Sequence, residues 1–272
     1  MNNKVALVTG ASSGMGRETV LELRKRGYIV YGGARRLEKM QDLEAKGINI
    51  ISLDVTNEDS MVLCVNHIIE KEGHIDVLVN NAGYGSYGAI EDVSLEEAHH
   101  QFEVNLFGLG RMSQLVLPYM RKNNYGKIVN ISSMGGKVAT PFGGWYHASK
   151  FAVEGFSDCL RMEAAHFGVD VILIEPGLIQ SEWNHIAIDN LKKSSKGGAY
   201  EKASNDYAHK LSNMYSKSSI SSPKLIARTI ADAVTAKKPK TRYLRGYCAK
   251  LCVFLNRLFG DRIYDSLIQK IM

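Results

Sequence analysis

A glycine-rich loop directly follows the first apolar segment of the chain. Residues 4–9 are mostly apolar, and the sequence then continues as Gly10-Ala11-Ser12-Ser13-Gly14-Met15-Gly16. These glycines allow a tight turn and a close approach to a pyrophosphate, and a helix starting near Gly14 offers free N–H groups. The spacing is wider than GxGxxG, and the alternative is an ordinary strand-to-helix turn. We predict a dinucleotide-binding loop within an α/β fold.

Apolar, β-branched segments alternate with longer segments of helical periodicity. We predict strands at 4–9, 28–33, 48–53, 75–79, 127–131, 169–174 and 241–244, and helices that include 17–26, 97–122 and about 147–167. Several strands are apolar almost throughout, which is typical of parallel strands covered on both faces. We therefore expect an α/β fold: a single doubly wound, Rossmann-type parallel sheet of about seven strands with helices on both faces.

The 272 residues, 45% of them hydrophobic, are predicted to form one dinucleotide-binding domain over 1–272. Ser, Lys, Asn and Gly become frequent between about 182 and 222, where we expect a mobile substrate loop or lid. Its aromatic residues could line the substrate pocket or serve ordinary packing. The amphipathic tail, about 246–272, could cover the core, form a subunit contact or lie on a membrane surface; the first two are favoured.

Composition excludes several classes of protein. The net charge is +6, and Lys and Arg are scattered up to residue 190, which favours anionic ligands and argues against nucleic acid as a partner. The four cysteines form no CxxC pair and the eight histidines show no metal-ligand spacing, so we expect free thiols and no metal. The first strand starts at residue 4, and no apolar segment reaches the ~20 residues of a membrane span. We predict a cytoplasmic protein.

The end of the second predicted strand distinguishes the two nicotinamide cofactors. A carboxylate there would bind a ribose 2′-hydroxyl, whereas an arginine accommodates a 2′-phosphate. The chain has no carboxylate at this point but has Arg35 and Arg36, which can bind phosphate through two N–H groups. This pattern predicts NADP(H) as the cofactor. The alternative for Arg36 is a solvated residue at the start of a helix.

Two further strand ends offer contacts to the adenosine half of the cofactor. Asp54, followed by Val55, could accept a hydrogen bond from the adenine amino group; the alternative is a helix N-cap before Glu58. After the fourth strand, the small residues Asn81, Ala82 and Gly83 would let the backbone pack against the ribose.

Tyr146 and Lys150 are four residues apart and therefore share one face of a helix. A phenol normally titrates near ~10. A neighbouring ammonium and an oxidised nicotinamide both favour the phenolate, which lowers this pKa. Ser133 ends the fifth strand, where its hydroxyl would donate to a substrate carbonyl oxygen. These residues predict a proton donor for a carbonyl group.

Taken together, the motifs resemble the short-chain dehydrogenase/reductase family over nearly the whole chain. The glycine loop, the NNAG turn at 80–83, Asn105, Ser132-Ser133, the YxxxK element and Pro176-Gly177 stand in that family's order. Residues 237–243 and the tail resemble, more weakly, the hydroxysteroid and retinol dehydrogenase-like branch. The resemblance implies a catalytic tetrad formed by Asn105, Ser133, Tyr146 and Lys150. In it Asn105 holds a water, Lys150 also binds the nicotinamide ribose, and Ser133 and Tyr146 contact the substrate.

The family commonly has threonine, bound to the nicotinamide carboxamide, where this chain has Ser181, which keeps the hydroxyl. From the motifs and the resemblance together we expect a set of cofactor contacts: Gly10, Ser12, Ser13, Gly14, Met15, Gly16, Arg35, Arg36, Asp54, Val55, Asn81, Ala82, Gly83, Tyr146, Lys150, Pro176, Gly177, Ile179 and Ser181.

These expectations combine into an NADP(H)-dependent oxidoreductase that interconverts a secondary alcohol and a ketone or aldehyde, with reduction favoured. The resemblance implies a small hydrophobic substrate such as a hydroxysteroid, bile acid or retinoid, with a 3-oxoacyl ketone as the alternative. It also implies a homodimer or homotetramer built through 97–122 and 147–167. A different class stays open, a regulatory protein that senses NADP(H) without turnover.

Overall fold

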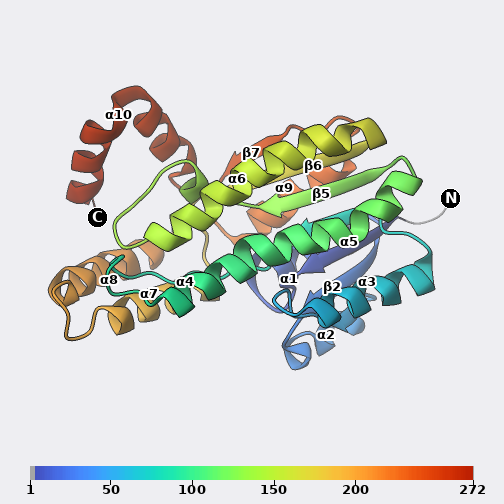
Figure 1. Ribbon diagram of the computed structural model, residues 1–272, viewed down its shortest axis with the longest axis horizontal. Helices are drawn as coiled ribbons and strands as arrows, with labels where there is room; N and C mark the ends of the chain where they lie inside the picture. Colours follow the sequence, from blue (N-terminus) through green and yellow to red (C-terminus); the bar gives the residue numbers. More distant parts are fainter. Residues whose placement is uncertain (1–3, 272) are drawn as a thin grey trace.

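The structure is a computed structural model that describes residues 4–271. Seven parallel strands form one sheet with the order β3-β2-β1-β4-β5-β6-β7 (Figure 1). Each strand begins and ends within two residues of the sequence prediction: β1 (Val5–Thr9), β2 (Ile29–Ala34), β3 (Asn49–Ser52), β4 (Val77–Asn80), β5 (Gly126–Ile131), β6 (Val169–Pro176) and β7 (Arg242–Arg245). The strand order reverses between β1 and β4, where ligands bind in such sheets.

Helices cover both faces of the sheet, so the predicted doubly wound fold is confirmed. Alternate residues of a strand point to opposite faces. In β1, Ala6 and Val8 pack toward α1 (Gly14–Lys25) and α9 (Pro223–Thr235). Val5 and Leu7 pack toward the opposite layer, which consists of α3 (Glu58–Glu72), α5 (Gly108–Lys122) and α6 (Gly144–Ala164). The short α2 (Gln41–Glu44) follows β2.

The predicted helix over 97–122 is interrupted by a wider turn. Its first part is α4 (Leu95–Phe102), a π-helical turn follows at Glu103–Phe107, and α5 then continues in the same direction. Asn105 lies in the middle of this turn. Such turns are rare and frequently occur at functional sites.

The segment predicted as a mobile substrate loop or lid is helical and forms α7 (Glu182–Ser194) and α8 (Glu201–Tyr215), while its role as a lid stays a prediction. They pack on each other through a small apolar core that includes Ile188, Leu191 and Tyr207. These apolar residues recur at helical spacing, so the helices bury one face although the composition is rich in Ser and Lys.

The tail forms α10 (Ala249–Ile271), which projects from the same end of the molecule as α7 and α8 (Figure 1). Gly260 breaks the helix with φ 67° and ψ 177°, a conformation that glycine tolerates best. Val253, Tyr264 and Ile268 pack against Val138 and anchor the tail to the body. Within residues 4–271 we find no helix with the length and apolar character needed to span a membrane.

Candidate active site

A pocket of about 350 Å³ opens at the carboxyl ends of the strands, beside the reversal in strand order. Its wall brings together the loops after β1, β2, β4, β5 and β6 with the starts of α6 and α7. Of the residues predicted from the sequence, Gly16 and Asn105 lie outside the wall. The wall contains all the others: Gly10, Ser12, Ser13, Gly14, Met15, Arg35, Arg36, Asp54, Val55, Asn81, Ala82, Gly83, Ser133, Tyr146, Lys150, Pro176, Gly177, Ile179 and Ser181.

The glycine loop is fixed against the end of β4. Asn81 Nδ2 donates to the carbonyl oxygens of Thr9 (2.9 Å) and Gly10 (3.2 Å), and Thr9 Oγ1 accepts from the backbone N–H of Asn81 (3.0 Å) and Ala82 (2.9 Å). A Cβ on Gly16 would lie 2.3 Å from the Gly10 carbonyl oxygen. Gly16 therefore allows α1 to pack behind the loop, a role that explains its place outside the pocket.

The start of α1 fits a dinucleotide phosphate. Its N-cap, Ser13, makes no side-chain capping bond, and the first turn holds no acidic residue. The first N–H groups of the helix and its positive dipole end are therefore available to an anion. A Cβ on Gly14 would lie 3.7 Å from Ser181 Cβ, so the loop faces the segment after β6 across the pocket. The glycine cradle can hold the pyrophosphate of a nicotinamide dinucleotide.

Two exposed arginines lie at the end of β2, beside the glycine loop. Arg35 and Arg36 follow β2 and line the pocket, and Arg36 Nη2 donates to Ser12 Oγ at 3.4 Å. The Glu182 carboxylate, at the start of α7, lies 4.0 Å from Arg36 and 3.9 Å from Lys39. This contact joins the two sides of the cofactor cleft.

Asp54 is not a helix cap. Its Oδ1 accepts from the backbone N–H (3.0 Å) and hydroxyl (2.8 Å) of Thr56, while Asn57 caps α3 by accepting from the Ser60 N–H. Asp54 and Val55 line the pocket. The alternative of an N-cap before Glu58 is therefore wrong for Asp54.

Tyr146 and Lys150 share one face of α6, as the spacing predicts, with Lys150 Nζ 6.0 Å from the centre of the Tyr146 ring. The lowered pKa predicted for Tyr146 is wrong, because burial raises it to about 12, and only a hydrogen bond with Ser133 opposes this effect. Burial lowers the pKa of Lys150 to about 8, and the negative charge of Glu154 opposes that. Lys150 Nζ also donates to the Ile131 carbonyl oxygen at 2.9 Å. The phenol is thus a proton donor at neutral pH.

The loop after β5 presents Ser133 to the phenol. Ser133 Oγ accepts from the Gly135 N–H at 3.0 Å, so its own hydrogen can be donated elsewhere. His147 Nε2 accepts from the Thr140 N–H at 3.0 Å, which places the ring hydrogen on Nδ1, 2.9 Å from the Gly135 carbonyl oxygen. Burial lowers the pKa of His147 and favours this neutral form. His147, which the sequence analysis did not single out, therefore ties both ends of the loop to α6.

Asn105 holds the chain after β4 in place. Its Oδ1 accepts from the Tyr84 N–H at 2.8 Å, and its Nδ2 donates to the Tyr84 carbonyl (2.9 Å) and to Ser149 Oγ (3.0 Å). A Cβ on Gly83 would lie 3.6 Å from Asn105 Oδ1 and 3.9 Å from Lys150 Nζ. Asn105 and Lys150 therefore converge on Gly83, and the water-holding role of Asn105 stays a prediction.

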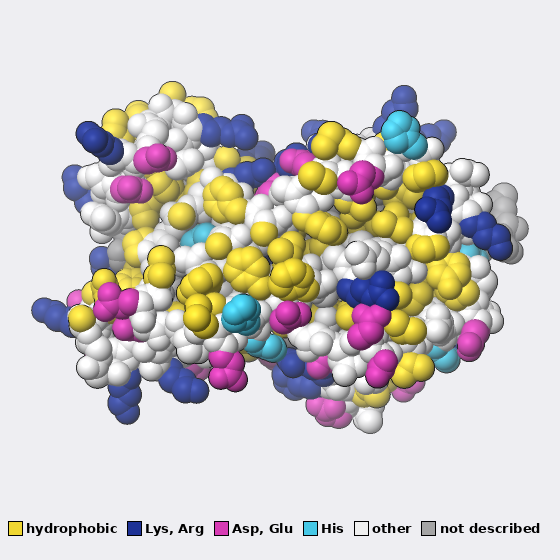
Figure 2. Space-filling view, in the orientation of Figure 1, with side chains coloured by type: hydrophobic (Ala, Val, Ile, Leu, Met, Phe, Trp, Pro, Cys, Tyr) yellow, Lys and Arg dark blue, Asp and Glu magenta, His cyan; other side chains and the backbone are white. Residues whose placement is uncertain are grey.

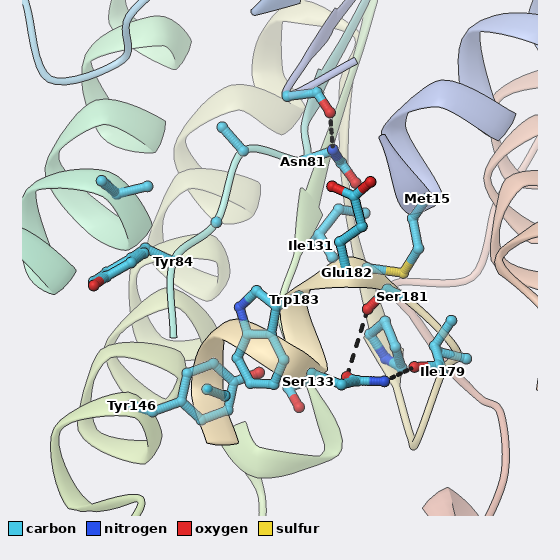
Figure 3. Close-up of a pocket in the computed structure, with 18 of the residues that line it drawn as sticks. Met15, Asn81, Tyr84, Ile131, Ser133, Tyr146, Ile179, Ser181, Glu182 and Trp183 are labelled. Carbon is cyan, nitrogen blue, oxygen red and sulfur yellow. Dashed lines mark hydrogen bonds between the residues drawn. The ribbon is translucent and has the colours of Figure 1, made fainter. Parts of the chain in front are cut away.

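Aromatic side chains line the part of the pocket beside Tyr146. The ring of Trp183 lies 5.1 Å from that of Tyr146 and 6.0 Å from that of Tyr87, and the Tyr87 and Tyr146 rings are 5.6 Å apart. Figure 3 shows Trp183 above Tyr146 and close to Ser133. A Cβ on Gly85 would lie 2.0 Å from Trp183 Cζ2, so the indole depends on a glycine at that position.

The segment after β6 is held by its own turn. Ser181 Oγ contacts Asn184 Oδ1 at 3.5 Å, and Asn184 Nδ2 donates to the Ile179 carbonyl oxygen at 2.8 Å (Figure 3). Both bonds stabilise the start of α7, where Ser181 faces the glycine loop. The predicted contact of Ser181 with the nicotinamide carboxamide stays a prediction.

A buried charge cluster supports the catalytic elements from behind. Glu154 on α6 and Glu175 on β6 are nearly inaccessible. Lys137 Nζ lies 2.7 Å from Glu154 and 3.7 Å from Glu175, and Arg242 Nε lies 3.0 Å and 3.3 Å from the same carboxylates. Burial, with Glu154 as a second cause, raises the pKa of Glu175 to about 7. The cluster joins the Ser133 loop, the Lys150 helix and the strand that leads to Pro176.

Comparison with known sequences agrees with this geometry. Residues 4–191 match the profile of the short chain dehydrogenase family. The chain is 42% identical over 208 residues to 3-ketodihydrosphingosine reductase of Bacteroides thetaiotaomicron, covering 76% of this chain and 73% of that protein. It is 32% identical to NADPH-dependent 3-dehydrocapnine reductase of Ornithobacterium rhinotracheale (98% and 96% covered) and 37% identical to human retinol dehydrogenase 8 (66% and 60% covered).

Solved structures agree as well. A short-chain dehydrogenase from Streptomyces avermitilis superposes with a TM-score of 0.82 at 32% identity, covering 100% of this chain and 97% of that one. A variant of actinorhodin polyketide ketoreductase, solved with NADPH, gives a TM-score of 0.71 at 30% identity, covering 85% and 90%. Complexes of this kind support NADP(H) as the cofactor. The chain therefore belongs to the short-chain dehydrogenase family and is an oxidoreductase.

Proposed function

We propose that this protein uses NADPH to reduce a ketone on a long-chain, amphipathic lipid to a secondary alcohol. Bound NADPH would supply the hydride to the carbonyl carbon. Tyr146 gives its phenolic proton to the carbonyl oxygen, while Ser133 donates a hydrogen bond to the same oxygen. The observation that carries the proposal is the convergence of Ser133, Tyr146 and Lys150 at one end of the cofactor cleft.

The protonation states favour reduction. A phenol whose pKa is about 12 holds its proton at neutral pH and can donate it. Lys150, whose pKa is about 8, is mostly charged there and stabilises the phenolate that remains after the transfer. In the opposite direction, Tyr146 would have to be ionised first, which burial disfavours.

NADPH is preferred over NADH because Arg35 and Arg36 offer two guanidinium groups at the end of β2, where NAD-specific sheets have a carboxylate. Arg36 is already held beside the glycine loop through Ser12. The name of the Ornithobacterium reductase also includes NADPH dependence.

The substrate side favours a lipid chain. The wall beside Tyr146 is mainly apolar and aromatic: Tyr87, Met134, Val138, Trp183, Ala187, Ile188, Tyr207 and Leu211. A relative at 42% identity is named 3-ketodihydrosphingosine reductase, whereas the retinol dehydrogenase covers less of the chain. These findings move the acyl-chain ketone ahead of the steroid, bile acid and retinoid classes that the sequence alone puts first.

Steady-state turnover tests the proposal. Purified protein is assayed for NADPH and NADH oxidation with a 3-keto sphingoid base, a long-chain 3-oxoacyl ester, a ketosteroid and retinal. We expect the highest kcat/KM for a long-chain ketone with NADPH. Tyr146→Phe should abolish turnover and leave NADPH binding intact. Tight NADPH binding without turnover of any of these carbonyls would favour the sensor function instead.

We also propose that the protein forms a homodimer or homotetramer. Phe107, Phe151 and Met162 expose large apolar side chains at the turn before α5 and along α6. Figure 2 shows hydrophobic side chains gathered over the face where α5 and α6 lie in Figure 1. Light scattering of the purified protein measures the subunit number, and a monomer would contradict this proposal.

A further inference from the structure

The C-terminal helix α10 carries large apolar side chains on its outer side. Leu251, Phe254 and Leu258 recur at helical spacing and are 57%, 60% and 59% exposed. Phe259, directly before the bend at Gly260, and Ile263, after it, are exposed as well. We call these five residues the outer ridge. A soluble surface rarely exposes so many large apolar residues together without a partner.

The opposite side of α10 anchors the ridge to the body. Val253, Tyr264 and Ile268 are buried against Val138, and Met134 packs at the edge of the same cluster. Since both parts of the broken helix contribute to this cluster, the bend at Gly260 lets them share one apolar core with Val138. The outer ridge is therefore held outward by packing on the side that faces the protein.

This end of the molecule carries an excess of positive charge. The segments that form it, residues 182–222 and 246–272, together contain 10 Lys and Arg against 6 Asp and Glu, a net charge of +4. On α10 itself, Lys250, Arg257 and Arg262 lie beside the outer ridge, and the ion pairs within residues 4–271 include none of the three. Figure 2 shows dark-blue cations around both lobes at this end.

We propose that the outer ridge docks on an anionic lipid bilayer. An interfacial helix binds membranes by burying apolar side chains among the lipid tails while its cations contact anionic headgroups. A nucleic acid would use the positive charge but offer nothing to the apolar residues. The surface thus combines the two features that a bilayer recognises, and the favourable contacts of both kinds lie on one helix.

Docking at this place serves the active site. Met134 and Val138 line the pocket and contact α10, and Leu178, also in the pocket wall, bridges to Tyr247 just before the helix. The bilayer would therefore lie next to the substrate side of the pocket. This role rests on the proposed function in one respect, because a long-chain ketone is dissolved in membranes rather than in water.

Vesicle flotation of the full-length protein tests the docking. We expect flotation with vesicles of equal parts phosphatidylcholine and phosphatidylglycerol, and much less with phosphatidylcholine alone. Phe254→Ser combined with Leu258→Ser should lower the partition coefficient about tenfold or more. Lys250→Glu combined with Arg257→Glu should lower it by at least about fivefold per cation. Leu63→Ser, equally exposed on α3, is the matched control and should change nothing.

Docking is refuted if the protein does not float with anionic vesicles, or if the Phe254→Ser, Leu258→Ser variant (the ridge variant) floats as well as the unmodified protein. It is also refuted if the ridge variant changes its subunit number without losing flotation, because the outer ridge would then contact a second copy of the chain. Turnover of a short, water-soluble ketone separates the two proposals, because the ridge variant should retain it fully. Turnover without flotation refutes docking alone, and flotation without turnover of any ketone refutes the proposed function alone.

Discussion

Replacing Gly85 by alanine tests whether Trp183 forms the substrate wall. The added methyl group would lie 2.0 Å from Trp183 Cζ2 and 2.4 Å from Cε2, whereas ordinary contacts begin at 3.4 Å. The indole must therefore retreat by about 1.4 Å, and close-packed surroundings transmit such a shift. Because the Trp183 ring lies 5.1 Å from that of Tyr146, the space for substrate beside the phenol changes directly.

The expected cost follows from overpacking. Forcing one methyl group into a packed wall costs ~1–3 kcal/mol, which corresponds to a loss of roughly 5- to 150-fold in kcat/KM for a bulky ketone. The dissociation constant of NADPH should not change, since Gly85 and Trp183 lie on the substrate side. Steady-state kinetics and NADPH fluorescence titration measure the two quantities. Gly155→Ala, on α6 with no atom within 4 Å of the new methyl group, is the matched control.

A double-mutant cycle tests whether Gly85→Ala acts through Trp183. Trp183→Ala removes the atoms that the new methyl group would strike, so Gly85→Ala should cause almost no further loss in that background. If the two losses simply add, or if Gly85→Ala alone leaves kcat/KM unchanged, Trp183 does not form the wall that we describe.

Three other predictions concern charge. In the reduction direction, kcat/KM should fall as the pH rises above about 8, because Lys150 loses its proton there. Glu154→Gln removes a negative charge that favours the Lys150 ammonium, so it should move this fall to lower pH. A pH profile unchanged by the substitution would contradict this. Substituting Arg35 and Arg36 together by alanine should weaken NADPH binding roughly 10- to 100-fold and leave NADH binding unchanged, as titration of both cofactors would show. Glu182→Gln breaks an exposed contact across the cleft, so it should speed NADPH release by no more than about fivefold in stopped-flow measurements.

The strands and the main site could be predicted because their signals are local. Each buried parallel strand is an apolar segment, and the glycine loop, the turn at 80–83 and the Tyr146–Lys150 pair each lie within a few residues of sequence. The doubly wound topology then brings these segments to one edge, where all but two of the predicted residues line the pocket.

The features that were missed depend on contacts between distant segments. Composition between 182 and 222 suggested a loop, because Ser and Lys on the outer faces hide the apolar stripe of α7 and α8. The five-residue π-helical turn around Asn105 hardly disturbs the helical periodicity of the sequence, so the sequence pattern does not reveal it. The sequence around Gly85 does not show that Trp183 packs on it, and the sequence around Glu154 does not show that it pairs with Arg242.

Isotope transfer tests the central claim most directly. NADPH that carries deuterium at its transferable position is incubated with the protein and a long-chain 3-keto lipid, and the product is analysed by mass spectrometry. Our account predicts one deuterium on the new carbinol carbon, formed by the unmodified protein and not by Tyr146→Phe, which still binds NADPH. A product without deuterium, or equal labelling by the Tyr146→Phe variant, would contradict hydride transfer assisted by Tyr146.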